Sequence, residues 1–494
     1  MTVGSKVFKL NVWLEEHPEA ECRGPRHLEI LGITHDSRQV RPGWLFAALP
    51  GTRSHGLDYV SDALQRGAVA VLCEQFPARL DKPATLIRVP SVRPVLADLA
   101  EAFYGHPASR LRLAGITGTN GKTTITFLAR AILEEPKAPW GLIGTIEYRI
   151  GERVIPASRT TPEAPYIQQY LSQMVQAGCA GAVMEVSSHA LDQSRVRGRL
   201  FDVGVFTNLT QDHLDYHQTM ENYFLAKRKL FTDLGRGEKS AVAVINGDDP
   251  YGRRLLTDPE IAVPILSYGL SQECQIRACD VKADLQGSRF RVVTPWGEGE
   301  AAVRLPGMYN VSNALASIGL AGALGVPLEI ILKRIETVRQ VPGRLEPVPN
   351  RRGVQVFVDY AHTEDALTNV LQTLRPMTQG RLIVVFGCGG DRDPGKRPRM
   401  GAAAARYADY TILTSDNPRR ENPDMIIAQI RSGMPPEAPC AIEPDRAEAI
   451  RTALATARPG DVVLIAGKGH ETFQEFENRM VPFDDREAAR RCLE

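Results

Sequence analysis

The sequence predicts a three-domain α/β protein, and three observations support this fold class. The chain has 494 residues, and one domain per roughly 100–200 residues predicts about three domains. Short apolar, β-branched runs alternate with helical patterns, which is typical of parallel sheets with crossover helices. Most of these runs end in polar motifs, and ligands of open parallel sheets bind beyond the carboxyl ends of the strands. We expect the domains at residues 1–107, 108–341 and 342–494.

The middle block, 108–341, is predicted to contain a parallel sheet followed by antiparallel strands. A helical pattern, "TTITFLARAILEE" (123–135), follows the first strand. Residues 273–305 read as antiparallel strands, and a helix begins near Met308. The predicted parallel strands are "LRLAGIT" (111–117), "AGAVMEVSS" (180–188), "FDVGVFTNLT" (201–210) and "AVAVINGDD" (241–249).

The last block, 342–494, is predicted to contain a second, fully buried parallel sheet, because its strand-like runs are continuously apolar. Pro342 and Gly343 are the candidate linker before it. The predicted strands are "VQVFVDY" (354–360), "RLIVVFG" (381–387), "YTILTS" (410–415) and "DVVLIAG" (461–467). Seven polar loops follow strands of the two sheets, so we expect a site where the sheets face each other.

Composition excludes several other classes of protein. The formal net charge of +1 lacks the basic excess of a nucleic-acid binder. No apolar run reaches the roughly 18 residues of a membrane span, and the N-terminus lacks a signal-peptide core. Eight cysteines without CxxC pairs favour reduced thiols over disulfides or a zinc site. We therefore expect a cytoplasmic enzyme.

"GITGTNGKTT" (115–124) is the strongest chemical signal. Its glycines let backbone N–H groups approach phosphates, the Lys122 ammonium can reach the terminal phosphates, and the Thr123 hydroxyl can hold Mg²⁺. The stretch is not a strict Walker A, because Ile116 stands where that pattern has its first glycine and Gly118 supplies the bend instead. The alternative is a Gly/Thr-rich turn, which the preceding strand and the following helix disfavour.

Three further residues are candidates for a metal site. Glu185 ends a strand, and a carboxylate there is the usual second anchor for Mg²⁺ beside a phosphate loop. His213 follows another strand of the same sheet, and neutral imidazole binds metals, although a lone histidine is more often a surface residue. Lys227 lies in "NYFLAKRKLF", where periodicity alone favours a solvated basic helix face.

Together these motifs resemble the Mur ligases of peptidoglycan synthesis. The matching stretches recur in order from about residue 110 to 475: "GTNGKTT", "TTPE", "EVSSHAL", "TNLTQDHLDYH", "FLAKRKLF", "MYNVSNALAS", "PGRLE", "DYAHT" and "GKGHE". "HDSRQVRPGWLFAALPG" near the start resembles the nucleotide-sugar module of the branch that adds the third amino acid of the stem peptide. The resemblance implies an N-terminal UDP-sugar-binding domain, a central P-loop-type ATPase and a C-terminal Rossmann-like domain.

The resemblance also implies a reaction and its cofactors. ATP phosphorylates a carboxylate of the UDP-linked muramyl-dipeptide, the amine of the incoming amino acid attacks the acyl phosphate, and phosphate leaves. Two Mg²⁺ sites are implied, formed by Thr123, Glu185, His213 and Lys227, with Lys227 carbamylated so that it offers an anionic oxygen. A monomer that binds only small-molecule substrates is expected.

Binding residues are carried over position by position. ATP is expected at Gly118, Thr119, Asn120, Gly121, Lys122, Thr123, Thr124, Asn310, Asn313, Arg344 and Asp359. The UDP-muramyl-dipeptide is expected at Ser37, Thr52, Arg53, Ser54, Thr160, Thr161, Ser187, Gln193 and Arg195. Two departures from the family pattern are Arg159, where asparagine is common, and Glu364, where proline is usual and where we expect only a loop to change.

The stretch "DNPR" (416–419) resembles the form that family members use for meso-diaminopimelate. An arginine fork suits the distal carboxylate of that amino acid, whereas it would repel the terminal ammonium of lysine. The expected pocket is Arg392, Asp416, Asn417, Pro418, Arg419, Gly467 and Glu471, with Arg420 solvated. The alternatives are the same ligase with L-lysine, another ligase of the superfamily, and a non-catalytic nucleotide-binding switch.

Overall fold

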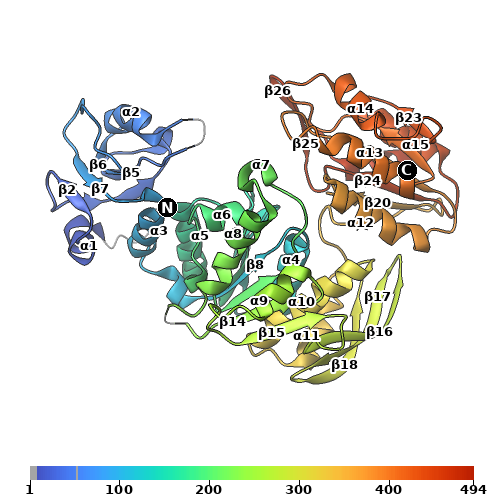
Figure 1. The fold of residues 1–494 in the computed structure, drawn as a ribbon, viewed down its shortest axis with the longest axis horizontal. Helices are drawn as coiled ribbons and strands as arrows, with labels where there is room; N and C mark the ends of the chain where they lie inside the picture. The colour runs from blue at the N-terminus through green and yellow to red at the C-terminus, as the bar shows by residue number, and fades with distance from the viewer. Residues whose placement is uncertain (1–7, 52–53, 238) are drawn as a thin grey trace.

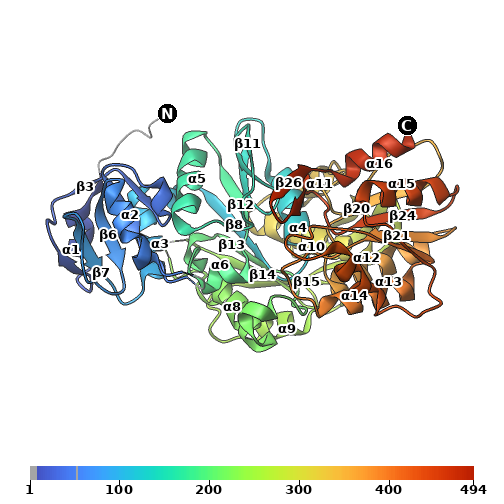
Figure 2. The same ribbon diagram turned by 90° about the horizontal axis from the view of Figure 1, so that it is seen from above.

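The computed structural model describes residues 8–51, 54–237 and 239–494, and it forms three lobes arranged in a row (Figures 1 and 2). Each lobe contains one large sheet, of five, eleven and six strands in chain order. This arrangement confirms the predicted three-part α/β fold. No helix in these ranges combines the length and the apolar character that a membrane crossing requires.

The N-terminal lobe is built on the five-stranded sheet, ordered β2-β7-β6-β5-β4. All neighbours are parallel except β2 and β7. The elements are β1 (Phe8–Lys9), α1 (Leu10–Glu16), β2 (Glu21–Arg23), β3 (Glu29–Ile30), β4 (Gly32–Thr34), β5 (Trp44–Ala47), α2 (Val60–Gln65), β6 (Ala68–Cys73), β7 (Thr85–Arg88) and α3 (Val92–Phe103).

The central sheet has the order β11-β10-β9-β12-β8-β13-β14-β15-β16-β17-β18. Its middle strands are parallel, and antiparallel strands flank them at both edges. The strands are β8 (Arg112–Thr117), β9 (Trp140–Ile143), β10 (Glu147–Ile150), β11 (Arg153–Pro156), β12 (Gly181–Glu185), β13 (Val203–Phe206), β14 (Val242–Asn246), β15 (Ile265–Gly269), β16 (Ile276–Asp284), β17 (Gly287–Thr294) and β18 (Gly297–Val303).

Helices cover both faces of this sheet, which explains why its parallel strands are apolar throughout. Leu128 of α4 and Leu315 of α10 share one buried cluster with Ile116, whereas Leu171 of α5 and Leu230 of α8 share another with Leu113. The helices are α4 (Lys122–Leu133), α5 (Ala164–Gln176), α6 (Ser188–Asp192), α7 (Leu214–His217), α8 (Met220–Thr232), α9 (Pro250–Leu256), α10 (Met308–Ala323) and α11 (Leu328–Ile335).

The C-terminal sheet has the order β19-β20-β24-β21-β22-β23, and only β19 is antiparallel to its neighbour. Helices α12 to α14 cover one face, and α15 and α16 cover the other. The elements are β19 (Glu346–Pro347), β20 (Gln355–Asp359), α12 (Glu364–Leu374), β21 (Leu382–Phe386), α13 (Lys396–Tyr407), β22 (Tyr410–Leu413), α14 (Pro423–Arg431), β23 (Cys440–Ile442), α15 (Arg446–Thr456), β24 (Val462–Ala466), β25 (Phe473–Phe476), β26 (Arg479–Pro482) and α16 (Asp485–Leu493).

All eight predicted parallel strands are present. Strand β8 ends at Thr117 as predicted, the other seven end earlier, and the polar motifs form the loops beyond them. The antiparallel β10–β11 edge and the β25–β26 hairpin were not predicted from the sequence. The predicted domain limits fall in the 3₁₀ turn Pro107–Arg110 and between α11 and β19.

Candidate active site

Two adjoining cavities lie where the central and C-terminal lobes meet. The first, of about 520 Å³, is lined by residues 119–124 of the phosphate loop and by the start of α12. The second, of about 1290 Å³, is lined by the loops that follow β21, β22 and β24. The two cavities share a wall made of Thr210, Asp212, His213, Tyr360, His362, Thr363 and Asp365.

The phosphate loop needs its glycines at two close approaches. Gly118 has a φ of +146°, and a Cβ there would lie 1.8 Å from Thr207 Oγ1. Gly121 has a φ of +88°, and its Cβ would lie 2.4 Å from Asn313 Oδ1. Helix α4 begins at Lys122, so its positive N-terminal end points to the cavity. The loop therefore has the backbone geometry of an anion site.

Two lysines meet at one carbonyl of this loop. Lys122 Nζ donates to the carbonyl oxygens of Gly118 at 2.9 Å and Thr119 at 2.8 Å, and Lys227 Nζ donates to the same Gly118 oxygen at 2.8 Å. Burial lowers the pKa of Lys122. Burial, followed by the nearby Lys122 charge, lowers the pKa of Lys227 well below its ordinary value. The lowered pKa makes the uncharged amine of Lys227 more accessible than that of an ordinary lysine.

The solvated basic face that periodicity favoured for "KRK" is wrong at Lys227, whose exposed fraction is 1%. Helix α8 packs against α6 and the sheet, so its inner side buries Lys227 with Phe231. Its two neighbours do point outward: Arg228 pairs with Asp258 at 2.5 Å and Lys229 with Asp192 at 2.8 Å.

Glu185 is buried at the end of β12 and is held by three donors. Its Oε2 accepts from Thr123 Oγ1 at 3.0 Å and Thr145 Oγ1 at 2.9 Å, and its Oε1 accepts from Thr145 N at 2.8 Å. The hydroxyl and the carboxylate proposed for Mg²⁺ are therefore adjacent. Within the described residues, no group of three or more His, Cys, Asp or Glu side chains could hold a metal ion.

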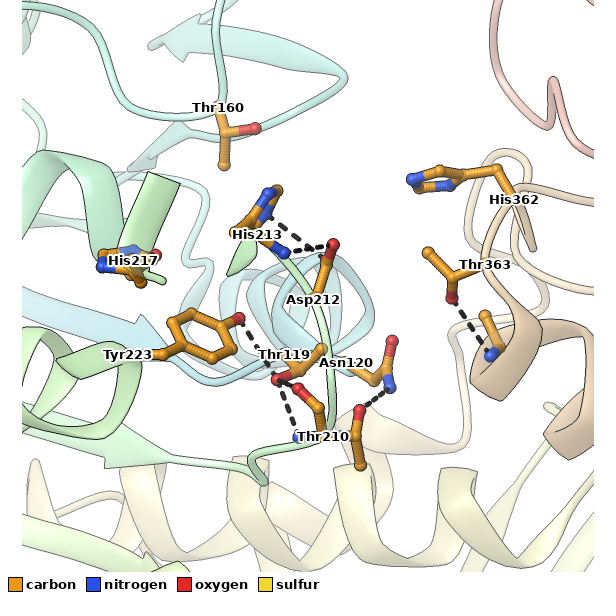
Figure 3. Close-up of polar contacts among 12 residues, drawn as sticks. Thr119, Asn120, Thr160, Thr210, Asp212, His213, His217, Tyr223, His362 and Thr363 are labelled. Carbon is orange, nitrogen blue, oxygen red and sulfur yellow. Dashed lines mark hydrogen bonds and ion pairs between the residues drawn. The ribbon is translucent and has the colours of Figure 1, made fainter. Parts of the chain in front are cut away.

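His213 lies at the shared wall with Asp212, and His362 faces both from the C-terminal lobe (Figure 3). His213 has a φ of +53°, and its backbone N–H donates to Asp212 Oδ1 at 2.8 Å. Burial lowers the pKa of His213 to about 4, although the Asp212 charge opposes the shift. The neutral ring is the form that a metal requires.

The expected adenosine and C-terminal contacts also line the first cavity. Asn313 Nδ2 donates to Asn310 Oδ1 at 3.0 Å on α10. Arg344 crosses from the other lobe and donates from Nη2 to Thr123 Oγ1 at 3.1 Å. Both carboxylate oxygens of Asp359 accept backbone N–H groups, from Leu345 at 2.6 Å and Ala361 at 2.8 Å, while burial raises its pKa.

The residues expected to hold the muramyl-dipeptide are split between the cavity wall and the layer behind it. Thr160 and Ser187 line the first cavity. Thr161 Oγ1 donates to Glu185 O at 2.8 Å and accepts from Ser187 N at 3.0 Å. Behind them, Arg195 donates from Nη2 to Gln193 Oε1 at 2.7 Å and from Nη1 to Thr161 O at 3.1 Å.

Arg159, the first departure from the family pattern, reaches this layer through Glu163, whose Oε1 also pairs with Arg195 Nε at 3.1 Å. Arg159 Nη1 donates to Glu163 Oε1 at 3.2 Å, and its side chain is 56% exposed.

The expected uridine residues lie in the N-terminal lobe. Ser37 is buried in the 3₁₀ turn Ser37–Gln39, and Tyr166 of the central lobe donates to Gln39 at 2.7 Å beside it. Ser54 lies in the loop after β5. Thr52 and Arg53 lie outside the described residues.

The second cavity brings together the loop 416–419 and the "GKGHE" loop. Asn417 Nδ2 donates to Glu471 Oε2 at 2.9 Å. Lys468 Nζ donates to the same Glu471 oxygen at 2.8 Å and to Asn417 Oδ1 at 3.0 Å. Arg419 lines the cavity with its side chain 20% exposed. A carboxylate and a guanidinium therefore stand in one cavity, as an amino acid with charges at both ends requires.

The remaining expected pocket residues differ in their placement. Arg392, Asp416 and Gly467 line the second cavity. Pro418 is buried and is not one of the described residues that line this cavity. Its carbonyl oxygen accepts from Glu421 N at 3.0 Å. Arg420 is 70% exposed and pairs with Asp391 at 2.9 Å.

Glu364 does not lie in a loop, contrary to the expectation from sequence. It is the first residue of α12, after Thr363, whose side chain caps the helix by accepting from Ala366 N at 3.2 Å. Proline is well tolerated at a first helical position, and a carboxylate is stabilised there by the helix dipole. Either residue therefore fits this place.

Several residues of the site were not predicted from the sequence. Asp212, His362 and Asp365 line both cavities, and Asp365 Oδ2 accepts from Asn120 Nδ2 at 2.9 Å. Lys468 and Glu475 contact the predicted pocket residues. The position of Asp212 and His362 inside quoted polar loops is a signal that could have pointed to them.

Comparisons with known proteins agree with this geometry. "Mur ligase family, catalytic domain" matches residues 29–104, "Mur ligase middle domain" matches 116–321, and "Mur ligase, glutamate ligase domain" matches 343–469. A Geobacter metallireducens protein named UDP-N-acetylmuramoyl-L-alanyl-D-glutamate--2,6-diaminopimelate ligase is 47% identical over 488 residues, covering 95% of both chains.

The chain belongs to the Mur ligase family. A Roseiflexus protein named UDP-N-acetylmuramyl-tripeptide synthetase is 45% identical over 487 residues, covering 95% of each chain. A solved structure of a UDP-N-acetylmuramoyl-L-alanyl-D-glutamate--2,6-diaminopimelate ligase is 33% identical, covers 99% of both chains and has a TM-score of 0.69. As a Mur ligase, the protein is an ADP-forming ligase that joins a carboxylate to an amine.

Proposed function

We propose that this Mur ligase adds meso-2,6-diaminopimelate to UDP-N-acetylmuramoyl-L-alanyl-D-glutamate, forming ADP and phosphate, in peptidoglycan precursor synthesis. The observation that carries the proposal is the second cavity, where Arg419 and the Glu471–Asn417 pair stand beside the phosphate-loop cavity. Relatives whose printed names include this activity support it.

The charges of the second cavity favour diaminopimelate over lysine. Diaminopimelate has an amine and a carboxylate at each end, so its distal carboxylate can take the planar donors of Arg419 while Glu471 takes an ammonium. Lysine presents only an ammonium at its far end, which Arg419 would repel. A pocket built to bind a charged group discriminates strongly against an analogue that lacks it.

The reaction has two steps, and its reactants occupy adjoining cavities. The γ-phosphoryl group of ATP moves to a carboxylate oxygen of the muramyl-dipeptide, which breaks the bond to ADP and forms an acyl phosphate. The nitrogen of the amino acid then attacks the acyl carbon, the carbon–oxygen bond to phosphate breaks, and the nitrogen loses a proton. Lys122 stabilises the charge on the transferring group, and the shared wall holds the amine near the acyl carbon.

We infer that two Mg²⁺ ions would be held by Thr123, Glu185, His213 and a carbamylated Lys227, and the adjacency of Thr123 and Glu185 supports this. Thr123 and Glu185 offer adjacent hard oxygen donors, and His213 offers a neutral nitrogen. Carbamylated Lys227 would supply an anionic oxygen, and its lowered pKa favours the uncharged amine that reacts with carbon dioxide. When bound, Mg²⁺ would neutralise charge on the phosphates.

The proposal includes the setting of the reaction. The substrates are ATP, the UDP-linked dipeptide and the free amino acid, which are small cytoplasmic molecules. We propose a monomer with no nucleic-acid partner.

Amino-acid-dependent phosphate release tests the proposal. The purified protein is given ATP, Mg²⁺ and UDP-N-acetylmuramoyl-L-alanyl-D-glutamate, and phosphate is measured with meso-diaminopimelate, L-lysine, D-alanyl-D-alanine or D-glutamate. Stimulation by meso-diaminopimelate above the others is expected. Preference for any of the others would overturn the proposal, as would a nucleotide that stays bound without substrate-dependent release of ADP.

A further inference from the structure

The geometry points to Glu475, on the β25–β26 hairpin, as the positioning residue that orients Arg419 and thereby sets the amino-acid specificity of the site. This inference rests on the proposed function, because it concerns how the same cavity selects a distal carboxylate.

The hairpin is docked against the loop 416–419 by backbone and amide contacts. Glu475 O accepts from Arg419 N at 3.0 Å, and Glu475 N donates to Asn417 Oδ1 at 2.9 Å. Gln474 Nε2 donates to Asp416 O at 2.9 Å. Two successive hairpin residues therefore hold three residues of the loop.

This docking holds Arg419 in an unusual backbone conformation. Arg419 has a φ of +51°, which is uncommon for a long side chain and persists only where the surroundings determine it. Here the backbone pairing with the hairpin does so, and it directs the side chain into the second cavity.

Two of the three guanidinium nitrogens of Arg419 are anchored by hydrogen bonds to described residues. Its Nε donates to Glu475 Oε2 at 2.7 Å, and its Nη1 donates to Gly390 O at 2.8 Å. A Cβ on Gly389 would lie 3.0 Å from Nη1, so the glycine loop packs closely against the group. A guanidinium has five N–H donors, and these two contacts leave the others, on Nη1 and Nη2, to face a ligand carboxylate.

Glu475 acts on a ligand only through Arg419. Its side chain is 40% exposed, and Glu475 is not one of the described residues that line the second cavity. Without its carboxylate, Arg419 Nε loses its partner, and the remaining contact from Nη1 to Gly390 O leaves the guanidinium able to turn about that contact. Lysine has no distal carboxylate, so its residual use is independent of this orientation.

Steady-state kinetics with two amino acids tests the assignment. Glu475→Ala should lower kcat/KM for meso-diaminopimelate about 10-fold or more through KM, since a charge-assisted hydrogen bond is lost. The low kcat/KM for L-lysine should stay within about 2-fold of the wild-type value, so the ratio of kcat/KM for diaminopimelate to that for lysine should fall. Glu475→Gln should retain most of the diaminopimelate activity, because its amide oxygen still accepts from Nε.

A double-mutant cycle and a matched control complete the test. Arg419→Ala/Glu475→Ala should be no worse than Arg419→Ala, because the second residue acts through the first. Glu477→Ala removes an exposed carboxylate from the same hairpin and should change nothing. Thermal unfolding of every variant checks the fold.

The outcomes separate this inference from the proposed function. Equal losses with diaminopimelate and lysine, or fully additive effects in the cycle, would show that the hairpin is only structural. A wild type that uses diaminopimelate and loses nothing in Glu475→Ala overturns the inference alone. A wild type that does not use diaminopimelate overturns both.

Discussion

At the scale of single residues, the crowding of Lys122 and Lys227 on one carbonyl oxygen is the feature with the clearest chemical meaning. Both Nζ atoms donate to Gly118 O, so a positive charge on both would be repulsive, and the Lys122 charge adds to burial in lowering the pKa of Lys227. A carbamate would turn the repulsion into attraction. The two lysines therefore have different expected phenotypes.

Lys122→Ala should reduce turnover by about 10²-fold or more, because a preorganised charge at the transferring phosphoryl group is lost. The fold should persist, since among the described residues the ammonium hydrogen-bonds carbonyl oxygens of its own loop. Steady-state phosphate release and circular dichroism measure the two effects. Wild-type turnover in this variant would remove Lys122 from the mechanism.

Lys227→Ala should also lose most activity, and a short carboxylic acid in the buffer should restore part of it by replacing the carbamate oxygens. Carbon NMR of protein equilibrated with labelled bicarbonate should show a carbamate signal that the variant lacks. Lys229→Ala is the control, because that side chain is 51% exposed and pairs with Asp192 on the surface. A fully active Lys227→Ala protein without a carbamate signal in the wild type would end the idea.

Arg419→Ala should raise the KM for meso-diaminopimelate roughly 30-fold or more, since truncating one partner of a partly buried charge pair costs about 2–5 kcal/mol. The KM values for ATP and the UDP-linked dipeptide should change little. L-Lysine should not become a good substrate, because removing repulsion creates no partner for its ammonium. Arg420→Ala is the control: it removes an exposed ion pair with Asp391 and should behave as wild type.

At the scale of elements, a buried ion pair joins the last two long helices to the amino-acid loops. Arg446 on α15 and Asp485 on α16 are both fully buried, with Nε to Oδ1 at 2.7 Å and Nη2 to Oδ2 at 2.7 Å. The same guanidinium donates to Ala466 O at 2.9 Å and Ser415 O at 3.3 Å. Ala466 is the last residue of β24, where the "GKGHE" loop begins, and Ser415 follows β22, where the loop 416–419 begins.

Asp485→Ala should lower the free energy of unfolding by about 3–5 kcal/mol, because it leaves a buried guanidinium without its counter-ion. Urea unfolding followed by circular dichroism measures the change. Glu487→Ala, on the exposed side of α16, removes only a surface pair and should cost less than about 1 kcal/mol. Similar midpoints for the two variants would show that the buried pair contributes little.

At the scale of the whole molecule, the linker at Pro342 and Gly343 between the central and C-terminal lobes is held by hydrogen bonds. Gly343 O accepts from Tyr360 N at 2.9 Å, and Gly343 N donates to Glu346 Oε2 at 2.8 Å. The next residue, Arg344, reaches Thr123 in the central lobe. The linker thus sets how the C-terminal lobe meets the phosphate loop.

Gly343→Ala should reduce kcat/KM and destabilise the protein by more than the roughly 1–2 kcal/mol of a left-handed residue. Its φ is +63°, and its Cβ would lie 2.2 Å from His470 N. Gly325→Ala is a matched control, because its φ is +81° but nothing lies within 4 Å of the added Cβ. Equal losses of stability in the two variants would mean that the close approach at Gly343 is unimportant.

The sequence predicted the layers of the fold better than the contacts of the site. Apolar runs and the loops behind them follow from local periodicity, so the parallel strands were predictable. Periodicity could not place Lys227, because burial of a lysine on α8 depends on what packs against the helix. Glu475 was missed because its partner Arg419 lies 56 positions earlier in the chain. Pairings between residues so far apart in the chain are tertiary contacts, which local sequence patterns do not indicate.

The wall shared by the two cavities has a consequence for inhibition. A compound in the nucleotide cavity and another in the amino-acid cavity would touch some of the same side chains, including Asp212 and His362. We therefore expect the binding of one compound to change the affinity for the other. Measuring inhibition while the concentrations of both compounds are varied together detects this effect. A single molecule linking both chemotypes across that wall would avoid the second loss of translational freedom, and so bind more tightly than either part.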